Sequence, residues 1–134
     1  MKLGASGVQM ATRFVTTDEC DASQGFKQAY IDACEKDIEI IKSPVGMPGR
    51  AIFSSFIQKV KDGKKQPKKC PFKCIKTCDI TKSPYCIIIA LISALKGNFE
   101  AGFAFAGSNA FRATKITSVK EIFQSLLQEY KESK

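Results

Sequence analysis

The stretch GVQMATRF, residues 7–14, decides how the rest of this 134-residue chain is interpreted. Val8 and Met10 alternate with polar neighbours, which is typical of a short strand, and the polar loop TTDE follows at residues 16–19. A strand that ends in small residues, a threonine and an arginine suits an anion site. Its backbone N–H groups can approach a phosphate closely, and Thr12 adds a hydroxyl donor. The same composition also fits a strand-to-loop junction with a purely structural role, so both interpretations stay open.

Most of the remaining chain has the apolar spacing and the capping residues of helices. The expected helices cover residues 22–35, residues 51–60, a stretch that begins at Ser83–Pro84 and ends at Gly97, and residues 118–130. Residues 37–42 are expected to form a second short strand, because isoleucines alternate there. Two prolines and two glycines make residues 43–49 a rigid loop that either lines a pocket or only connects its neighbours. The predicted fold class is therefore mostly α with one or two short strands.

The net charge of +8 is concentrated in one part of the chain. Nine lysines and only two aspartates lie between residues 58 and 82. This part contains no arginine and a single aromatic residue, Phe72, so it offers few side chains that could stack on nucleic-acid bases. We therefore interpret residues 61–69 as a solvated, lysine-rich linker and predict no nucleic-acid partner.

The apolar segments are short. No apolar run follows Met1 and Lys2, so a secretory signal is not expected. The longest apolar run, residues 86–95, is too short to span a bilayer. We therefore predict a cytoplasmic protein without a membrane partner, whose six cysteines are reduced or bound to metal.

Four of the cysteines form a C-x3-C-x3-C-x7-C pattern: Cys70, Cys74, Cys78 and Cys86. On a helix the first three would share a face, and four gathered thiolates could hold zinc or an iron–sulfur cluster. The spacing matches neither a zinc ribbon nor a ferredoxin. The alternative is a set of packed cysteines that stabilises a small helical subdomain without a metal.

Three stretches together resemble one family. GVQMATRF, SPVGMPGRA at residues 43–51 and AFAGSNA at residues 104–110 are similar to segments of the nitronate monooxygenase flavoproteins, a group that includes the type II flavin-dependent enoyl-ACP reductases. The resemblance implies a C-terminal fragment of a (β/α)8 (TIM) barrel, because a complete barrel needs about 250 residues. The resemblance also implies that residues 1–60 contain the last barrel strand and the helices and loop that follow it. A cysteine-containing helical subdomain and the final barrel helix would then occupy residues 70–134, beyond the 61–69 linker.

The resemblance also implies a cofactor site for FMN. The residues that correspond to the family's flavin contacts are Gln9, Met10, Ala11, Thr12 and Gly107. The family segment usually reads GVQMGTRF, so Ala11 stands where glycine is usual. A Cβ at this position could crowd a phosphate or forbid a positive φ.

The implied activity is FMN-dependent oxidation of nitronates or nitroalkanes. The alternatives are NAD(P)H-dependent enoyl-ACP reduction in the same family, a four-cysteine metal module, and a non-catalytic fragment that pairs with a missing N-terminal barrel portion. The chain contains no histidine, the family's usual base, so the catalytic residues are expected upstream and this chain alone is expected to be inactive. The sequence leaves open whether the protein is a homo-oligomer.

Overall fold

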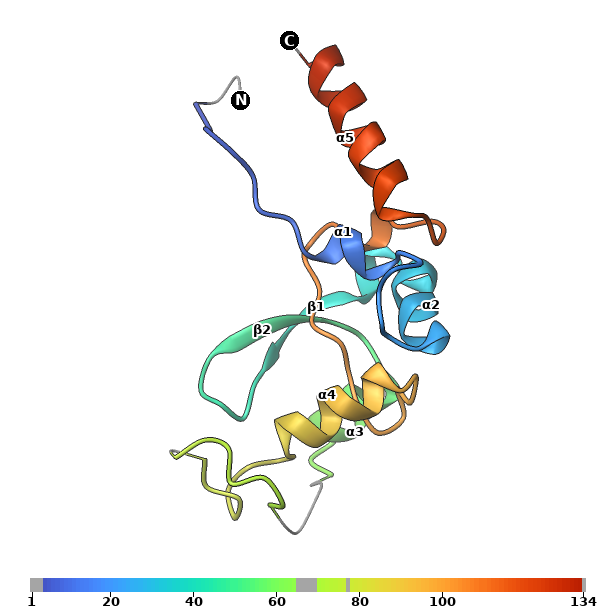
Figure 1. Ribbon diagram of the computed structural model, residues 1–134. Helices are drawn as coiled ribbons and strands as arrows, with labels where there is room; N and C mark the ends of the chain where they lie inside the picture. The colour runs from blue at the N-terminus through green and yellow to red at the C-terminus, as the bar shows by residue number, and fades with distance from the viewer. Residues whose placement is uncertain (1–3, 65–69, 77, 134) are drawn as a thin grey trace.

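The structure is a computed structural model that describes residues 4–64, 70–76 and 78–133. Figure 1 shows several short helices arranged around a small sheet. The elements in chain order are α1 (Thr12–Val15), α2 (Gln24–Asp32), η1 (Glu35–Asp37), β1 (Ile38–Lys42), β2 (Pro48–Ile52), α3 (Ser55–Lys61), α4 (Ile87–Leu95), η2 (Ala110–Arg112) and α5 (Val119–Glu132). The mostly helical fold class with a two-stranded sheet is confirmed. Most of the predicted 61–69 linker lies outside the described residues.

The sheet is an antiparallel hairpin of β1 and β2, in which Ile38 faces Ile52 and Lys42 faces Pro48. Gly46 turns the chain between the strands with a φ of +94°, a conformation that favours glycine. A later segment joins the other edge of β2. Its Ala104 carbonyl accepts a hydrogen bond from Ile52, and its Ala106 N–H donates to the Arg50 carbonyl, each at 3.0 Å.

The sequence pattern did not reveal β2. The expected helix at residues 51–60 begins only at Ser55, where the Ser54 hydroxyl accepts a hydrogen bond from the Ile57 N–H. Ala51 and Ile52 belong to β2 instead, because β1 and residues 104–106 bind their backbone groups. Helix α2 likewise begins later than expected, at Gln24. Ser23 is its N-cap, because the Ser23 hydroxyl accepts a hydrogen bond from the Phe26 N–H.

The predicted strand at residues 7–14 is wrong. Residues 7–10 are extended and exposed, and within the described residues no backbone hydrogen bond pairs them with a neighbour. Residues Thr12–Val15 form the single-turn helix α1. An extended segment becomes a strand only where another strand binds its N–H and C=O groups, and Figure 1 shows this segment running away from the sheet.

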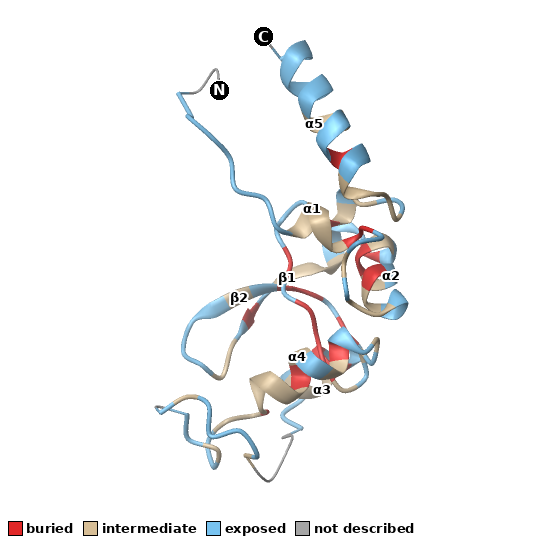
Figure 2. Cartoon of the chain, in the orientation of Figure 1, coloured by how far each residue is buried: buried red, intermediate tan, exposed pale blue. Residues whose placement is uncertain are grey.

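Two packed clusters form the core. One joins β1, β2, α3 and α4 through Ile41, Ala51, Phe56, Ile57, Tyr85, Ala90 and Phe103. The other joins α2 to β2 and η2 through Tyr30, Ala33, Ile52, Ala104, Ala106 and Ala110. Figure 2 shows these buried residues on the sheet, on the helices beside it and on the segment that follows α4. Residues on both sides of the 61–69 linker therefore share one core. In the described part of the chain, no helix combines the length and apolar character needed to cross a bilayer.

Helix α5 confirms the helix expected at residues 118–130 and begins with a capping box. The Glu121 N–H donates to the Ser118 hydroxyl at 3.2 Å, and the Ser118 N–H donates to the Glu121 carboxylate at 2.8 Å. The apolar stripe expected on this helix is largely uncovered. Only Ile122 is buried, while Phe123 and Leu127 are 55% and 59% exposed. Helix α5 projects away from the sheet and contacts α1 near its base (Figure 1).

The contact between α1 and α5 predicts a pH dependence. Arg13 and Ser125 donate hydrogen bonds to the Glu129 carboxylate at 3.0 and 2.7 Å, and these bonds lower the pKa of Glu129 below its usual 4.5. A carboxyl whose pKa is lowered by folding stabilises the fold above its usual pKa. It loses that contribution as the pH falls through the lowered value. Glu129→Gln should therefore lower the melting temperature by about 2 °C at pH 7 and by less at pH 3.

Thermal unfolding followed by circular dichroism at both pH values measures this difference. Glu132→Gln is the matched control, because Glu132 accepts a hydrogen bond from Gln128 and has no cationic partner in the described residues. Equal effects of the two variants at pH 7 would contradict the prediction.

Candidate functional site

A cleft of about 940 Å³ lies between the N-terminal segment, the region around η2 and α5. Figure 1 shows these three parts on the same side of the molecule. The N-terminal segment lines the cleft with Gln9, Met10, Ala11, Thr12 and Arg13, and the region around η2 contributes Gly107 to Ala110 and Arg112 to Lys115. All five residues predicted to contact FMN therefore lie on one cleft. Their role in binding FMN stays a prediction.

Thr12 and Gly107 join the two walls of this cleft. The Gly107 N–H donates a hydrogen bond to the Thr12 hydroxyl oxygen at 2.9 Å, across 95 positions of sequence. A Cβ added to Gly107 would lie 3.2 Å from that oxygen, closer than side-chain carbons normally come. Glycine at position 107 therefore permits this close approach, and the hydroxyl of Thr12 keeps its own proton free to donate.

The two arginines of the cleft differ in their hydrogen-bond and ion-pair partners. Arg13 is held by Glu129 and Ser125. The exposed Arg112 side chain, at the end of η2, makes no hydrogen bond or ion pair within the described residues. Sequence reasoning missed Arg112, although it follows AFAGSNA by only two positions. Its guanidinium is therefore available to a negatively charged ligand.

The structure corrects one expectation for Ala11. This residue has a φ of −123°, which any residue adopts, so its Cβ is compatible with the backbone. The expectation that a Cβ would forbid the required φ is wrong for this conformation. Ala11 is exposed and lines the cleft, so crowding of a bound phosphate stays a prediction.

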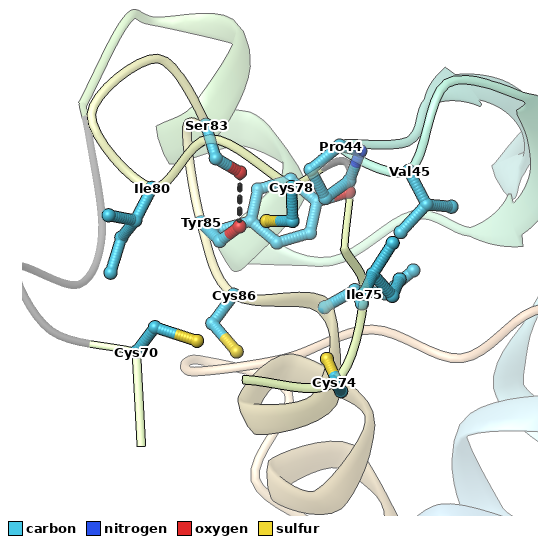
Figure 3. Close-up of a pocket in the computed structure, with 11 residues that line it drawn as sticks. Pro44, Val45, Cys70, Cys74, Ile75, Cys78, Ile80, Ser83, Tyr85 and Cys86 are labelled. Carbon is cyan, nitrogen blue, oxygen red and sulfur yellow. Dashed lines mark hydrogen bonds between the residues drawn. The ribbon is translucent and has the colours of Figure 1, made fainter. Parts of the chain in front are cut away.

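The four cysteines of the C-x3-C-x3-C-x7-C pattern line a second, much smaller pocket (Figure 3). The described residues between 70 and 86 form no helix, so the proposed common helical face does not exist. Pro71 and Lys73, whose φ is +46°, oppose helix formation there. Desolvation raises the pKa of Cys78, and the charges of Cys70, Cys74 and Cys86 raise it further. In the described residues no three His, Cys, Asp or Glu side chains form a group that could hold a metal ion.

Comparison with known proteins decides the family. The sequence profile of the nitronate monooxygenase family matches residues 1–129. This chain belongs to the nitronate monooxygenase family. The family comprises flavin-dependent oxidoreductases, so the resemblance inferred from residues 7–14, 43–51 and 104–110 is confirmed.

Curated relatives of the nitronate monooxygenase family match part of the chain. A probable nitronate monooxygenase of Staphylococcus saprophyticus is 44% identical over 62 residues, which are 46% of this chain and 18% of the relative. The corresponding protein of Staphylococcus haemolyticus is 41% identical over 59 residues, 44% of this chain and 16% of the relative. These matches span less than a fifth of either relative.

Solved structures match almost the whole chain. FabK from Thermotoga maritima superimposes with a TM-score of 0.75 and 27% identity over 98% of this chain and 39% of FabK. A point mutant of the same FabK matches with a TM-score of 0.72 and 26% identity, over 98% of this chain and 35% of the mutant. This member of the nitronate monooxygenase family therefore shares the fold of a minor part of FabK.

Proposed function

We propose that this chain forms the phosphate-binding side of the FMN site in an FMN-dependent oxidoreductase of the nitronate monooxygenase type. The observation that carries the proposal is the cleft, which is lined by Thr12, Gly107 and Arg112, and the Arg112 side chain has no partner among the described residues. The family match supports a flavin, and the residues of the cleft support its phosphate end.

The cleft fits the chemistry of a phosphate. Its volume of about 940 Å³ lies at the upper end of the range for cofactor and ligand sites, about 300–1,000 Å³. The Thr12 hydroxyl can donate to a phosphate oxygen while it accepts from the Gly107 N–H. Arg112 can add a charge-assisted, bidentate hydrogen bond. When bound, FMN supplies the electron or hydride transfer, and the residues of this chain hold and orient it.

The proposed substrate is a small nitronate, which the family match and the names of the curated relatives support. A second candidate is NAD(P)H-dependent enoyl-ACP reduction, which is supported by the likeness to FabK over 98% of the chain. The chain contains no histidine to act as a base. We therefore place catalysis in a complementary barrel portion, and we propose that this chain is inactive without it.

A direct test compares this chain alone with a chimera in which it replaces the matched 39% of FabK. We expect the chain alone to lose FMN on desalting and the chimera to retain it.

In the chimera, Arg112→Ala and Thr12→Val should each weaken FMN binding about tenfold, because each removes a hydrogen bond to a charged group. Riboflavin, which lacks the phosphate, should bind equally well to the unmutated chimera and to both of these variants. Ala11→Gly should tighten FMN binding.

Fluorescence titration with both flavins measures these affinities. Lys120→Ala is the control, because Lys120 is a cation of α5 that does not line the cleft. Equal losses for FMN and riboflavin, or FMN retained by the isolated chain, would contradict the proposal. Oxygen consumption with an alkyl nitronate, compared with NAD(P)H oxidation by an enoyl thioester, then separates the two candidate substrates.

A further inference from the structure

The small pocket of Figure 3 collects four of the six cysteines. Cys70, Cys74 and Cys78 reach it from the irregular segment after the linker, and Cys86 reaches it from the N-cap of α4. All six cysteines of the chain are free thiols. Since Cys20 and Cys34 do not line this pocket, the chain contains two natural reference thiols.

The segment that carries these cysteines has almost no core of its own. Among the described residues from 70 to 86, only Tyr85 is buried. A short segment that buries so little apolar surface usually depends on a disulfide or a metal ion to hold one conformation. Four thiols on one pocket offer the ligands for such an ion.

The backbone at the first two cysteines suits a metal-bound thiolate. The Lys73 N–H donates a hydrogen bond to the Cys70 sulfur at 3.3 Å. The residue that donates this bond has a φ of +46°, which is uncommon for a residue with a side chain. Hydrogen bonds of this kind orient metal ligands and stabilise their negative charge. The strained turn of CPFKC thus already directs a donor at the sulfur of Cys70.

The size and surroundings of the pocket are compatible with a single metal ion. Its volume of about 20 Å³ has room for one small ion between the cysteines. The other lining residues are mostly apolar and include Val45, Ile75 and Ile80. The exposed Lys73 and Lys76 lie in the same segment and can offset the negative charge of four thiolates around a divalent ion.

We propose that Cys70, Cys74, Cys78 and Cys86 bind a single thiophilic metal ion, Zn²⁺, which holds this segment in place. The described residues do not yet form a ligand shell, so the irregular segment closes around the ion when it binds. Four thiolates complete a tetrahedral site with no open position, so the ion is structural. Because Pro44 and Val45 also line the pocket, the ion would secure the segment against the β1–β2 loop as well as against α4.

Elemental analysis of the reduced chain, prepared anaerobically with Zn²⁺ and then desalted, tests the proposal without a flavin. We expect about one zinc per chain, and a melting temperature that falls in chelator. Replacement by Co²⁺ should produce the absorption of a tetrahedral thiolate site. Less than about a tenth of an equivalent of zinc, with a melting curve unchanged by chelator, would overturn the proposal. Iron with acid-labile sulfide would overturn the assignment of a single ion.

Thiol alkylation read by mass spectrometry assigns the ligands in the unmutated chain. With zinc present, the four pocket cysteines should be protected, while Cys20 and Cys34 react. Cys74→Ser and Cys86→Ser should each weaken zinc binding at least about tenfold, and Cys34→Ser should leave it unchanged. Alkylation of all six thiols at similar rates in the zinc-loaded protein would overturn the proposal even if a variant fails to fold.

Discussion

Replacing Phe103 by alanine should destabilise the fold by about 3–5 kcal/mol. The Phe103 side chain is fully buried at the centre of the first core cluster. Its ring packs edge-on against Phe105 and Tyr85, with centroids 5.0 and 5.8 Å away, and stacks on Phe56 at 6.2 Å. Truncation leaves a cavity between α3, α4 and the sheet, and the surrounding aromatic rings cannot fill it without leaving their partners. Urea unfolding followed by circular dichroism measures the change.

Phe72→Ala is the matched control, since the Phe72 ring is 46% exposed and makes no ring contact among the described residues. Its effect should stay within about 0.5 kcal/mol. Similar losses for the two variants would contradict the view that Phe103 organises the core.

Replacing Gly102 by alanine should cost about 3 kcal/mol or more, although it adds only one methyl group. A Cβ at Gly102 would overlap the carbonyl oxygen of Ala90 and lie 2.8 Å from the backbone nitrogen of Ala94. Both atoms belong to the backbone of α4, so the whole helix must move away for the methyl group to fit. That movement would open the packing of Ala90 and Ala94, which are at most 1% exposed. Thermal and urea unfolding measure the loss.

Gly7→Ala provides the control, because a Cβ at Gly7 meets no atom within 4 Å. The Gly7 variant should differ from the unmutated chain by no more than about 0.5 kcal/mol. If Gly102→Ala were equally harmless, α4 would not be seated on residue 102 as closely as the structure shows.

Where the deciding contacts are local, the sequence alone was sufficient. The capping box of Ser118 and Glu121 involves residues three positions apart, and the predicted start of α5 is confirmed. The alternating isoleucines of β1 also led to the right element. The family resemblance rested on three short motifs and is confirmed by the match over residues 1–129. The same motifs selected the five residues that are predicted to contact FMN, and these residues line one cleft.

Tertiary structure decided the elements and contacts that depend on distant partners. Residues 7–10 have the pattern of a strand but no strand beside them in the described residues, whereas Pro48–Ile52 becomes β2 because β1 and residues 104–106 bind its backbone. The bond between Thr12 and Gly107 spans 95 positions, and only the fold shows that Arg112 faces the same cleft. The physical reason is that side-chain periodicity and capping operate within a few residues, whereas strand pairing and the assembly of a cleft need groups that only the folded backbone brings together.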